Sequence, residues 1–392
     1  MDQRIEFAMK AVNSPNFREL CREYGISTKT GYKWRQRFKK GGLEGLNEQS
    51  RRPHSHADEL KEAVVCEMVC LKNAHRHWGP RKIRELYRRK NQTKELPSES
   101  SFKRVLERAG LTEPRRVRRS EDSGRLATGV RAEQPNDVWT VDFKGWWKDC
   151  DDLRVEPLTV RDEFSRNILE VRALENSQTA SVRACFERLF KAHGLPGAIR
   201  SDNGSPFASR NGLLGLTRLS AWWLALGINL ERSRPGCPQD NPAHERMHGD
   251  IMREIEAGRA GRDQAAFDVW RHEYNNERPH EAIAMRMPSE LYQPSPRVYV
   301  ETPEDLEYGS LLTRKVGNKG MVKYQGERYA LSTALAGWSV GLSPRADGPV
   351  EVWFAKLMVG HIHTETVNFT PVVPAPKTAR EHSAGPPAGS AS

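Results

Sequence analysis

The stretch AIRSDNGSPF, residues 198–207, predicts a short apolar strand that runs directly into Asp202, Asn203 and Gly204. Asp and Asn side chains bond to their own backbone and glycine tolerates a positive φ, so this triplet often ends a strand in a turn. A turn alone would explain it. The carboxyl end of a strand is also where open α/β sheets assemble their sites, so the meaning of Asp202 depends on where other acids fall.

The sequence on either side of this stretch predicts a mixed α/β layer. The upstream strands alternate apolar and polar residues, and an amphipathic helix ends at Gly194. Downstream, Asn241 is expected to cap a helix whose first residue is Pro242. The expected strands cover residues 137–147, 155–161, 168–174, 197–202 and 228–233, and the expected helices cover 177–194, 217–227 and 242–255. Antiparallel strands followed by alternating helices and strands are typical of an α/β layer.

Three acids fall at strand ends or helix starts of this layer. Asp142 lies on the first strand, Asp202 at the carboxyl end of the fourth, and Glu245 one turn into a later helix. Taken singly, each suits a solvated surface position. Three carboxylates that converge without nearby bases suit two hard divalent cations, which neutralise their repulsion and hold a phosphodiester in line. The pattern predicts a metal-dependent phosphoryl-transfer site.

Composition bounds the class of protein. With 392 residues the chain is long enough for two or three domains, each with its own core. Its mean hydropathy is −0.73 and no apolar run approaches the length of a membrane span. The first ten residues lack the apolar segment of a signal peptide, so we expect no secretion signal. Six cysteines in a chain of this size favour a reducing compartment over a disulfide framework.

Positive charge gathers in the first third of the chain. Residues 1–120 hold 29 Lys and Arg against 15 Asp and Glu, whereas the remaining residues hold 33 against 36. A basic front joined to a near-neutral remainder indicates a polyanion-binding module attached to a second function.

Residues 17–38 predict a helix-turn-helix. Leu20 and Tyr24 mark the apolar face of a first helix, Gly25 supplies the turn, and Ser27 caps a second helix. Any helical hairpin shows a similar pattern, but the basic second helix favours one that enters the major groove of DNA. The DNA contacts expected from this motif and the linker after it are Lys29, Thr30, Lys33, Arg35, Arg51 and Arg52.

A second helical block follows and predicts another helix-turn-helix, of winged-helix type. Ser98 is expected to cap its last helix, and Gly110 to end it. The DNA contacts expected here are Ser100, Lys103 and Arg104. Two cysteines and two histidines lie nearby, but their spacing matches no common zinc site: Cys66, Cys70, His75 and His77. The two cysteines are expected on a buried helix face.

Five stretches together resemble an insertion-sequence transposase of the DDE type with a retroviral-integrase-like catalytic core. They are, in order, VWTVDFKGWW, LTVRDEFSR, IRSDNGSPF, RPGCPQDNPAHERMHGDI and YNNERPHEAIAMRMPSELY. The resemblance covers roughly residues 1–295, helix-turn-helix front included. It implies an RNase H-like fold with the triad Asp142, Asp202 and Glu245. Arg246 and Arg278 join the expected DNA contacts, although Arg278 and His280 also suit packing of the core.

The resemblance implies a multidomain DNA transposase with N-terminal all-α helix-turn-helix modules, a central α/β core and a C-terminal small β-barrel. The barrel is expected from short alternating strands with glycine turns, and the tail, rich in Pro, Ala, Gly and Ser, is expected to be disordered. The expected parts are a helix-turn-helix domain at 1–46, a basic linker at 47–57, a second helix-turn-helix at 58–112, a basic linker at 113–134, the catalytic core at 135–297, the barrel at 298–369 and the tail at 370–392.

Such an enzyme would bind the terminal inverted repeats of its mobile element and catalyse strand cleavage and strand transfer with two Mg²⁺ or Mn²⁺ ions per site. Its partners would be double-stranded DNA, both element ends and target, and further copies of itself in a homodimer or larger assembly. A bacterial, cytoplasmic, nucleoid-associated location is implied, with no membrane contact. Two alternatives stay open: a DNA-binding transcriptional regulator with an inactive core, and a stand-alone RNase H-type nuclease that cuts without joining.

Two features depart from the family pattern. Asp202 and Glu245 are separated by 42 residues, more than usual, and the surplus is expected as a loop extension within residues 209–223. If Glu245 were not the third acid, Asp240 or Asp250 would replace it. The zinc-binding domain of retroviral integrases is not evident, and helix-turn-helix modules take its place.

Two histidines, His244 and His248, flank Glu245 in the sequence. A histidine ligand would favour a softer metal. We expect instead an oxygen-only metal site, with the imidazoles contacting DNA or packing beside it.

Overall fold

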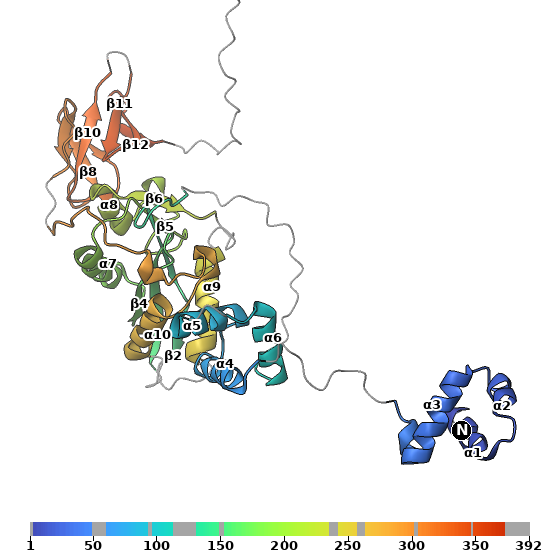
Figure 1. Cartoon of the computed structure of the whole chain (residues 1–392). Coiled ribbons are helices and arrows are strands. Elements are labelled where there is room, and N and C mark those ends of the chain that lie inside the picture. The colour runs from blue at the N-terminus through green and yellow to red at the C-terminus, as the bar shows by residue number, and fades with distance from the viewer. Residues whose placement is uncertain are drawn as a thin grey trace, which may run out of the picture. The chain divides into compact units, whose positions relative to one another are not determined.

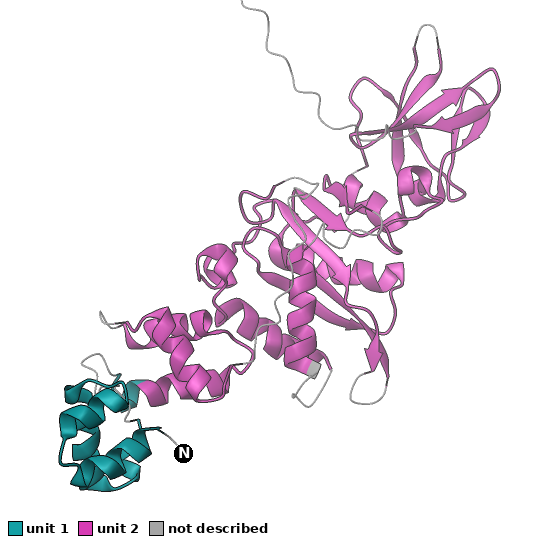
Figure 2. Cartoon of the chain, turned by 90° about the vertical axis from the view of Figure 1, so that its right-hand side faces the viewer, with its two compact units in different colours: residues 1–64 teal, residues 65–392 magenta. Residues whose placement is uncertain are grey.

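A computed structural model describes residues 3–48, 60–92, 96–112, 131–148, 153–234, 242–256, 263–301, 305–345 and 348–372. The chain forms two compact units, residues 1–64 and 65–392 (Figure 2). Among the described residues, no helix has both the length and the apolar character needed to cross a membrane. The expected linker 47–57, the basic run from residue 113 and the tail fall largely outside the described residues.

The first unit is a helix-turn-helix, as predicted. Its elements are α1 (Gln3–Asn13), α2 (Phe17–Glu23), α3 (Thr28–Gly41) and η1 (Glu44–Leu46). Ser27 accepts a hydrogen bond from the Thr30 amide, and Gly25 has a φ of +63° at the turn between α2 and α3. A Cβ on Gly31 would lie 2.6 Å from Cys21 Sγ, so α3 needs glycine where it crosses the Phe7–Cys21 core.

A helical segment follows: α4 (Glu62–Ala74), all but its first three residues in the second unit, then α5 (Pro80–Asn91) and α6 (Glu99–Arg108) (Figure 1). The predicted local signals are present: Ser98 accepts from the Ser101 amide at the start of α6, and Gly110 has a φ of +67° just after its end. The buried side chains of the segment are Met68, Trp78, Ile83, Tyr87, Phe102 and Leu106. Cys66 and Cys70 are exposed, so the expectation of a buried cysteine face was wrong.

A mixed sheet forms the centre of the second unit. Its strands are β1 (Val138–Phe143), β2 (Trp147–Lys148), β3 (Arg154–Asp162), β4 (Ile168–Leu174), β5 (Ala198–Ser201) and β6 (Asn229–Arg232). β3 pairs antiparallel with β1, β2 and β4, whereas β1, β5 and β6 run parallel to one another. The single strand expected over residues 137–147 is divided into β1 and β2. The strands expected over residues 155–161 and 168–174 pair as the antiparallel hairpin β3–β4, and the predicted order of the main strands is confirmed. This is an RNase H-like arrangement in which β1 and β5 end at the same edge.

Helices cover both faces of this sheet. One core cluster joins the sheet to α7 (Thr179–His193) and α8 (Arg218–Ala225), and a second joins it to α9 (Pro242–Ile251) and α10 (Gln264–Asn276). In keeping with this cover on both faces, most residues of β1 and β3 are buried. The connecting elements are η2 (Leu213–Gly215), η4 (Met252–Glu256), η5 (Glu281–Ile283) and η6 (Pro288–Glu290).

The C-terminal part is a small β domain. Its elements are β7 (Leu312–Lys315), β8 (Met321–Tyr324), β9 (Glu327–Ala330), η7 (Thr333–Leu335), β10 (Ser339–Ser343), β11 (Val350–Phe354), β12 (Leu357–His363) and β13 (Asn368–Pro371). Five strands pair in the order β13-β12-β11-β10-β7, and β8 and β9 form a separate hairpin. Within the described residues no ladder joins β7 to β13, so the sheet is open and the predicted closed barrel is not confirmed.

The surplus between Asp202 and Glu245 packs against this β domain. Leu213 and Leu216 are buried in one cluster with Ala221 of α8 and the core of the β domain. The Arg232 guanidinium donates to the carbonyls of Leu214 (3.0 Å) and Gly215 (2.9 Å) and so holds the extension to the end of β6. The predicted loop extension is therefore an internal support between catalytic sheet and β domain.

Candidate active site

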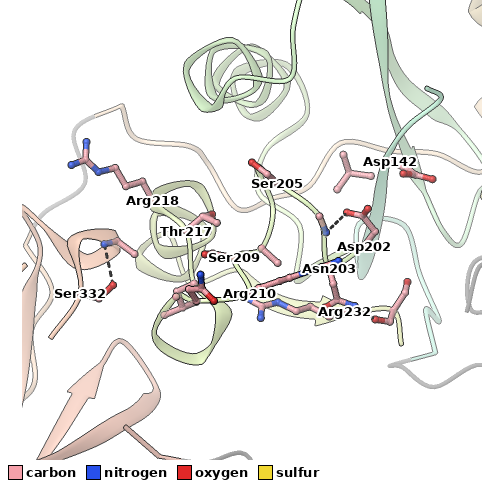
Figure 3. A pocket seen from close by; sticks show the side chains of 18 of the residues that line it. Asp142, Asp202, Asn203, Ser205, Ser209, Arg210, Thr217, Arg218, Arg232 and Ser332 are labelled. Atoms are coloured by element: carbon pink, nitrogen blue, oxygen red, sulfur yellow. Dashed lines mark hydrogen bonds between the residues drawn. The ribbon is translucent and has the colours of Figure 1, made fainter. Parts of the chain in front are cut away.

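The edge at which β1 and β5 end holds two of the three predicted acids. Asp142 is the second-last residue of β1 and Asp202 directly follows β5. In the parallel register Thr140 pairs with Arg200, and continuing it by two residues aligns Asp142 with Asp202. Glu245 comes from the first turn of α9. All three acids line one open cleft of about 1280 Å³, shown in part in Figure 3.

The Asp-Asn-Gly triplet is both a turn and part of the site. The Gly204 amide donates to Asp202 Oδ1 at 3.1 Å, and Asn203 Nδ2 donates to the Ser233 carbonyl beyond β6. A Cβ on Gly204 would lie 2.9 Å from Asp202 Oδ2, so a larger residue would displace the carboxylate. The turn thus orients the Asp202 side chain toward the cleft.

Electrostatics tie the acids together. Burial, together with the negative charges of Asp202 and Glu245, raises the pKa of Asp142 to about 7, against the lowering effects of the Phe143 amide and Lys144. A carboxyl whose pKa is raised toward neutrality by burial and by nearby negative charges is a common mark of a functional site. Three carboxylates sharing one cleft fit a hard divalent cation, whose charge removes their repulsion.

Behind Asp142 lies a buried pair of histidines. His244 and His248 are one turn apart on α9, and their rings meet edge to face at 4.7 Å. Burial lowers the pKa of His248 to about 3 and that of His244 well below its ordinary value. One ligand atom from each of Asp142, His244 and His248 lies within 4.8 Å of the others, so nitrogen atoms border the predicted oxygen site. The sequence signal for this was the His-x₃-His spacing on a helix.

Basic side chains line the rest of the cleft. Arg210, Arg218, Arg232 and Arg234 contribute to it, as does the turn at Ser332 in the β domain. In Figure 3, Asp142 and Asp202 lie toward one end of the view, Arg218 and Ser332 toward the other, and Arg210 and Arg232 between them. The cleft therefore combines acids at one part with guanidinium groups along its wall.

Comparison with known proteins agrees with this geometry. The sequence matches two families described as Integrase core domain, one over residues 132–238 and the other over residues 226–288. It also matches a Helix-turn-helix domain over residues 3–54 and a Homeodomain-like domain over 30–106. The chain therefore joins helix-turn-helix domains to an integrase core.

Two relatives carry insertion-element names. The insertion element IS407 uncharacterized 31.7 kDa protein of Burkholderia multivorans is 27% identical over 265 residues, covering 64% of this chain and 87% of that protein. The insertion element IS476 uncharacterized 39.2 kDa protein of Xanthomonas euvesicatoria is 27% identical over 255 residues, covering 64% of this chain and 70% of that protein. The chain is an insertion-element transposase with an integrase core.

Solved structures that match include retroviral integrases. The HTLV-2 integrase catalytic core domain in complex with magnesium is 15% identical, with a TM-score of 0.32, and covers 42% of this chain and all of that chain. A simian T-cell lymphotropic virus intasome in complex with PP2A regulatory subunit B56 gamma is 14% identical, with a TM-score of 0.36, and covers 67% of this chain and 90% of that chain.

In the transposase core, Arg278 is a structural residue. It is 4% exposed, and its guanidinium bonds to Asp250 Oδ2 at 2.7 Å and to Glu254 Oε1 at 3.0 Å. It also lies over the rings of Tyr274 and Trp78. The inclusion of Arg278 among the DNA contacts is therefore corrected, because its side chain is buried and both of its Nη atoms bond to acids inside the protein.

The same contacts bear on the choice of third acid. Asp250 is buried and paired with Arg278 and Arg253, so its carboxylate is not directed to the cleft. Asp240, the other substitute considered, lies outside the described residues, as does the cap residue Asn241. Glu245 is exposed and lines the cleft.

The remaining predicted DNA contacts lie on three helices. Lys29 and Lys33 are exposed on α3, whereas the Arg35 guanidinium stacks over Phe17 and Tyr32. Also on α3, the Thr30 hydroxyl bonds to the Ser27 hydroxyl. The other predicted contacts are exposed: Ser100, Lys103 and Arg104 on α6, and Arg246 on α9. Arg51 and Arg52 lie outside the described residues. For all the residues of this paragraph, binding to DNA stays a prediction.

The helical segment that carries α6 packs against the closing part of the core. His75 bonds to Glu273 of α10 at 3.1 Å, Arg81 pairs with Glu281, and Arg89 pairs with Glu290. His75 is thus engaged with a carboxylate and stacked on Trp78. Among the described residues the only metal-compatible group of His, Cys, Asp and Glu is the one at Asp142, so the four-residue set near Cys66 does not come together.

Proposed function

We propose that this transposase binds the terminal inverted repeats of its element, cleaves the DNA strand at each end and joins the freed end to target DNA. The observation that carries the proposal is the convergence of Asp142, Asp202 and Glu245 in one cleft, where burial and the charges of the other two acids raise the pKa of Asp142. Clustered carboxylates of this kind are costly unless a cation shares them.

The donor set fits Mg²⁺ or Mn²⁺. Asp142 and Asp202 would hold one ion between them, and Glu245 would complete a second position. Bound there, the metal would supply charge neutralisation at the phosphodiester and lower the pKa of the attacking group. The Gly204 amide and the turn it closes keep the Asp202 carboxylate in place for this task.

The chemistry needs no nucleotide cofactor. In the cleavage step, water attacks phosphorus, the bond from phosphorus to the 3′ oxygen breaks, and a 3′-hydroxyl and a 5′-phosphate are released. In the joining step, that 3′-hydroxyl attacks a target phosphodiester and displaces the target's 3′ oxygen. One phosphodiester replaces another, so the second step is close to balanced in free energy. Both are in-line displacements.

The arginines of the cleft suit the DNA backbone. Arg210 and Arg218 are exposed and line the same cleft as the acids, so phosphates can be held next to the reacting one. The recognition helix α3, with Lys29 and Lys33 exposed, would read the terminal repeat in the major groove. Joining two ends requires two copies on DNA, which supports a dimer or larger assembly.

The decisive experiment incubates the full chain with Mg²⁺, labelled element ends and a plasmid. Joined product is the expected result, and Asp202→Asn and Glu245→Gln should abolish both cleavage and joining while leaving DNA binding within about twofold, because these acids hold metal rather than DNA. Glu277→Gln, which alters an exposed acid at the end of α10, is the matched control and should join normally.

The two alternatives give different results in the same assay. A transcriptional regulator with an inactive core would bind the ends without metal-dependent cutting. A stand-alone nuclease would cut without producing joined molecules. Either outcome would refute the proposal.

A further inference from the structure

A buried hydroxyl connects Asp142 to both histidines behind it. Thr159 lies directly opposite Asp142 in the β1–β3 pairing. Its hydroxyl donates to the Asp142 carbonyl at 2.9 Å and lies 2.6 Å from His244 Nε2 and 2.8 Å from His248 Nε2. Two residues earlier on β1, Thr140 Oγ1 lies 2.9 Å from His244 Nδ1.

Counting protons assigns the form of each imidazole. A threonine hydroxyl has one proton and two lone pairs. Because the carbonyl of Asp142 can only accept, the Thr159 proton goes to it, and both Nε2 atoms must donate to the hydroxyl oxygen. His244 Nδ1 is then an acceptor, which the Thr140 hydroxyl satisfies at 2.9 Å; the alternative acceptor for Thr140, the Arg161 carbonyl, is farther away at 3.4 Å.

With the His248 proton on Nε2, the Nδ1 atom that lies beside the Asp142 carboxylate carries no proton. The two atoms, Nδ1 and Oδ2, are 3.9 Å apart. A protonated nitrogen facing a carboxylate would close to about 2.7–2.9 Å, so this spacing suits a lone pair. Two acceptors 3.9 Å apart can share a donor or a cation placed between them.

We propose that His248 is a positioning residue for the metal site: Thr159 holds it as the Nε2–H form, and its Nδ1 lone pair gives whatever binds Asp142, an ion or the water of an ion, a second acceptor. The proposal rests on the proposed function in one respect, that Asp142 binds a divalent cation. It modifies the oxygen-only site expected from the sequence, since a nitrogen borders it.

The first test uses the unaltered full chain without metal, so folding of a variant is not at issue. The chain is labelled with ¹⁵N-histidine, and a long-range ¹H–¹⁵N spectrum distinguishes the two neutral forms of each ring. His244→Asn and His248→Asn serve only to assign the signals. We expect both rings as the Nε2–H form. A His248 ring protonated on Nδ1 would overturn the proposal.

The second test measures Mn²⁺ affinity by titration calorimetry, without DNA. Asparagine places its side-chain carbonyl near the position of Nδ1, whereas glutamine reaches toward that of Nε2. We expect His248→Asn to bind Mn²⁺ within about threefold of the unaltered chain and His248→Gln to bind it roughly tenfold or more weakly, the range typical of groups that orient a metal site. His272→Asn, on an exposed position of α10, is the matched control and should change nothing.

The outcomes separate this inference from the proposed function. Equal affinities for His248→Asn and His248→Gln, or Mn²⁺ binding that does not depend on Asp142, would overturn the role of His248. Normal metal behaviour with no joined DNA would instead refute the proposed function and leave the positioning role intact.

Discussion

Replacing Arg278 by methionine should destabilise the catalytic core, not DNA binding. The guanidinium bonds to two carboxylates, Asp250 on α9 and Glu254 in η4, each with a side chain 12% exposed. Methionine has a similar length but leaves both acids without this partner. Removing one member of a buried ion pair costs about 3–5 kcal/mol because the other charge stays buried.

The structure places the expected loss at the lower end of that range. Glu254 keeps the indole Nε1 donor of Trp270 at 2.7 Å, and Asp250 keeps Arg253 at 2.8 Å. A loss of about 3 kcal/mol in the free energy of unfolding corresponds to a fall of roughly 6–12 °C in the midpoint of the core transition. Calorimetry of the full chain measures it directly.

A matched control separates the effect of breaking a buried ion pair from the effect of removing a positive charge. Arg253 contacts the same Asp250, but its side chain is 61% exposed, so Arg253→Met should cost no more than about 1 kcal/mol. Well below its transition, Arg278→Met should still bind and join element ends. An unchanged midpoint together with a weaker affinity for DNA would refute this reasoning and restore Arg278 as a residue that binds DNA.

Three further predictions concern the cleft and the recognition helix. The double change Arg210→Ala and Arg218→Ala should weaken DNA binding, measured by fluorescence anisotropy. It should also reduce the slope of log affinity against log salt concentration by about one for each phosphate that is no longer neutralised. As a control, Lys356→Ala at an exposed position of the β domain should change neither quantity. Because metal binds the ionised form of Asp142, Mg²⁺ affinity should fall by up to about tenfold per pH unit below pH 7 and level off above it. In the metal-free chain, the same raised pKa should make the free energy of unfolding decline as pH rises from about 4 to about 7, because the folded state holds the Asp142 proton more tightly than the unfolded state. Lys33→Ala should weaken binding to the terminal repeat, and an equal affinity in both proteins at every salt concentration would contradict the role of α3.

Features that depend on neighbours in the sequence could be predicted from it. The caps at Ser27 and Ser98 need only an amide three residues on, and the Asp202 turn closes within three residues. The strand order followed for the same reason, since alternation and turn residues are local signals. The acids were placed on the correct elements because strand ends and helix starts could be located, and their convergence then followed from the fold they imply.

Other features depend on which distant residue arrives beside them. Thr159 meets histidines 85 and 89 positions away, and Arg278 meets Asp250 and Glu254 of an earlier helix. An exposed arginine and a buried, doubly paired one have the same local sequence signature, so the stretch YNNERPHEAIAMRMPSELY alone left the role of Arg278 ambiguous. Likewise the extension near Leu213 has no periodicity that distinguishes a surface loop from a packed support.

The sequence by itself determined the helix-turn-helix front, the order of the α/β core and the elements that carry the three acids, because each follows from capping, alternation and turn chemistry within a few residues. Only the tertiary structure decided that Arg278 is internal, that the extension carries the β domain, and that His248 borders Asp142. Burial and hydrogen-bond partners of these groups are set by side chains from other elements, and their pairing has no counterpart in local sequence.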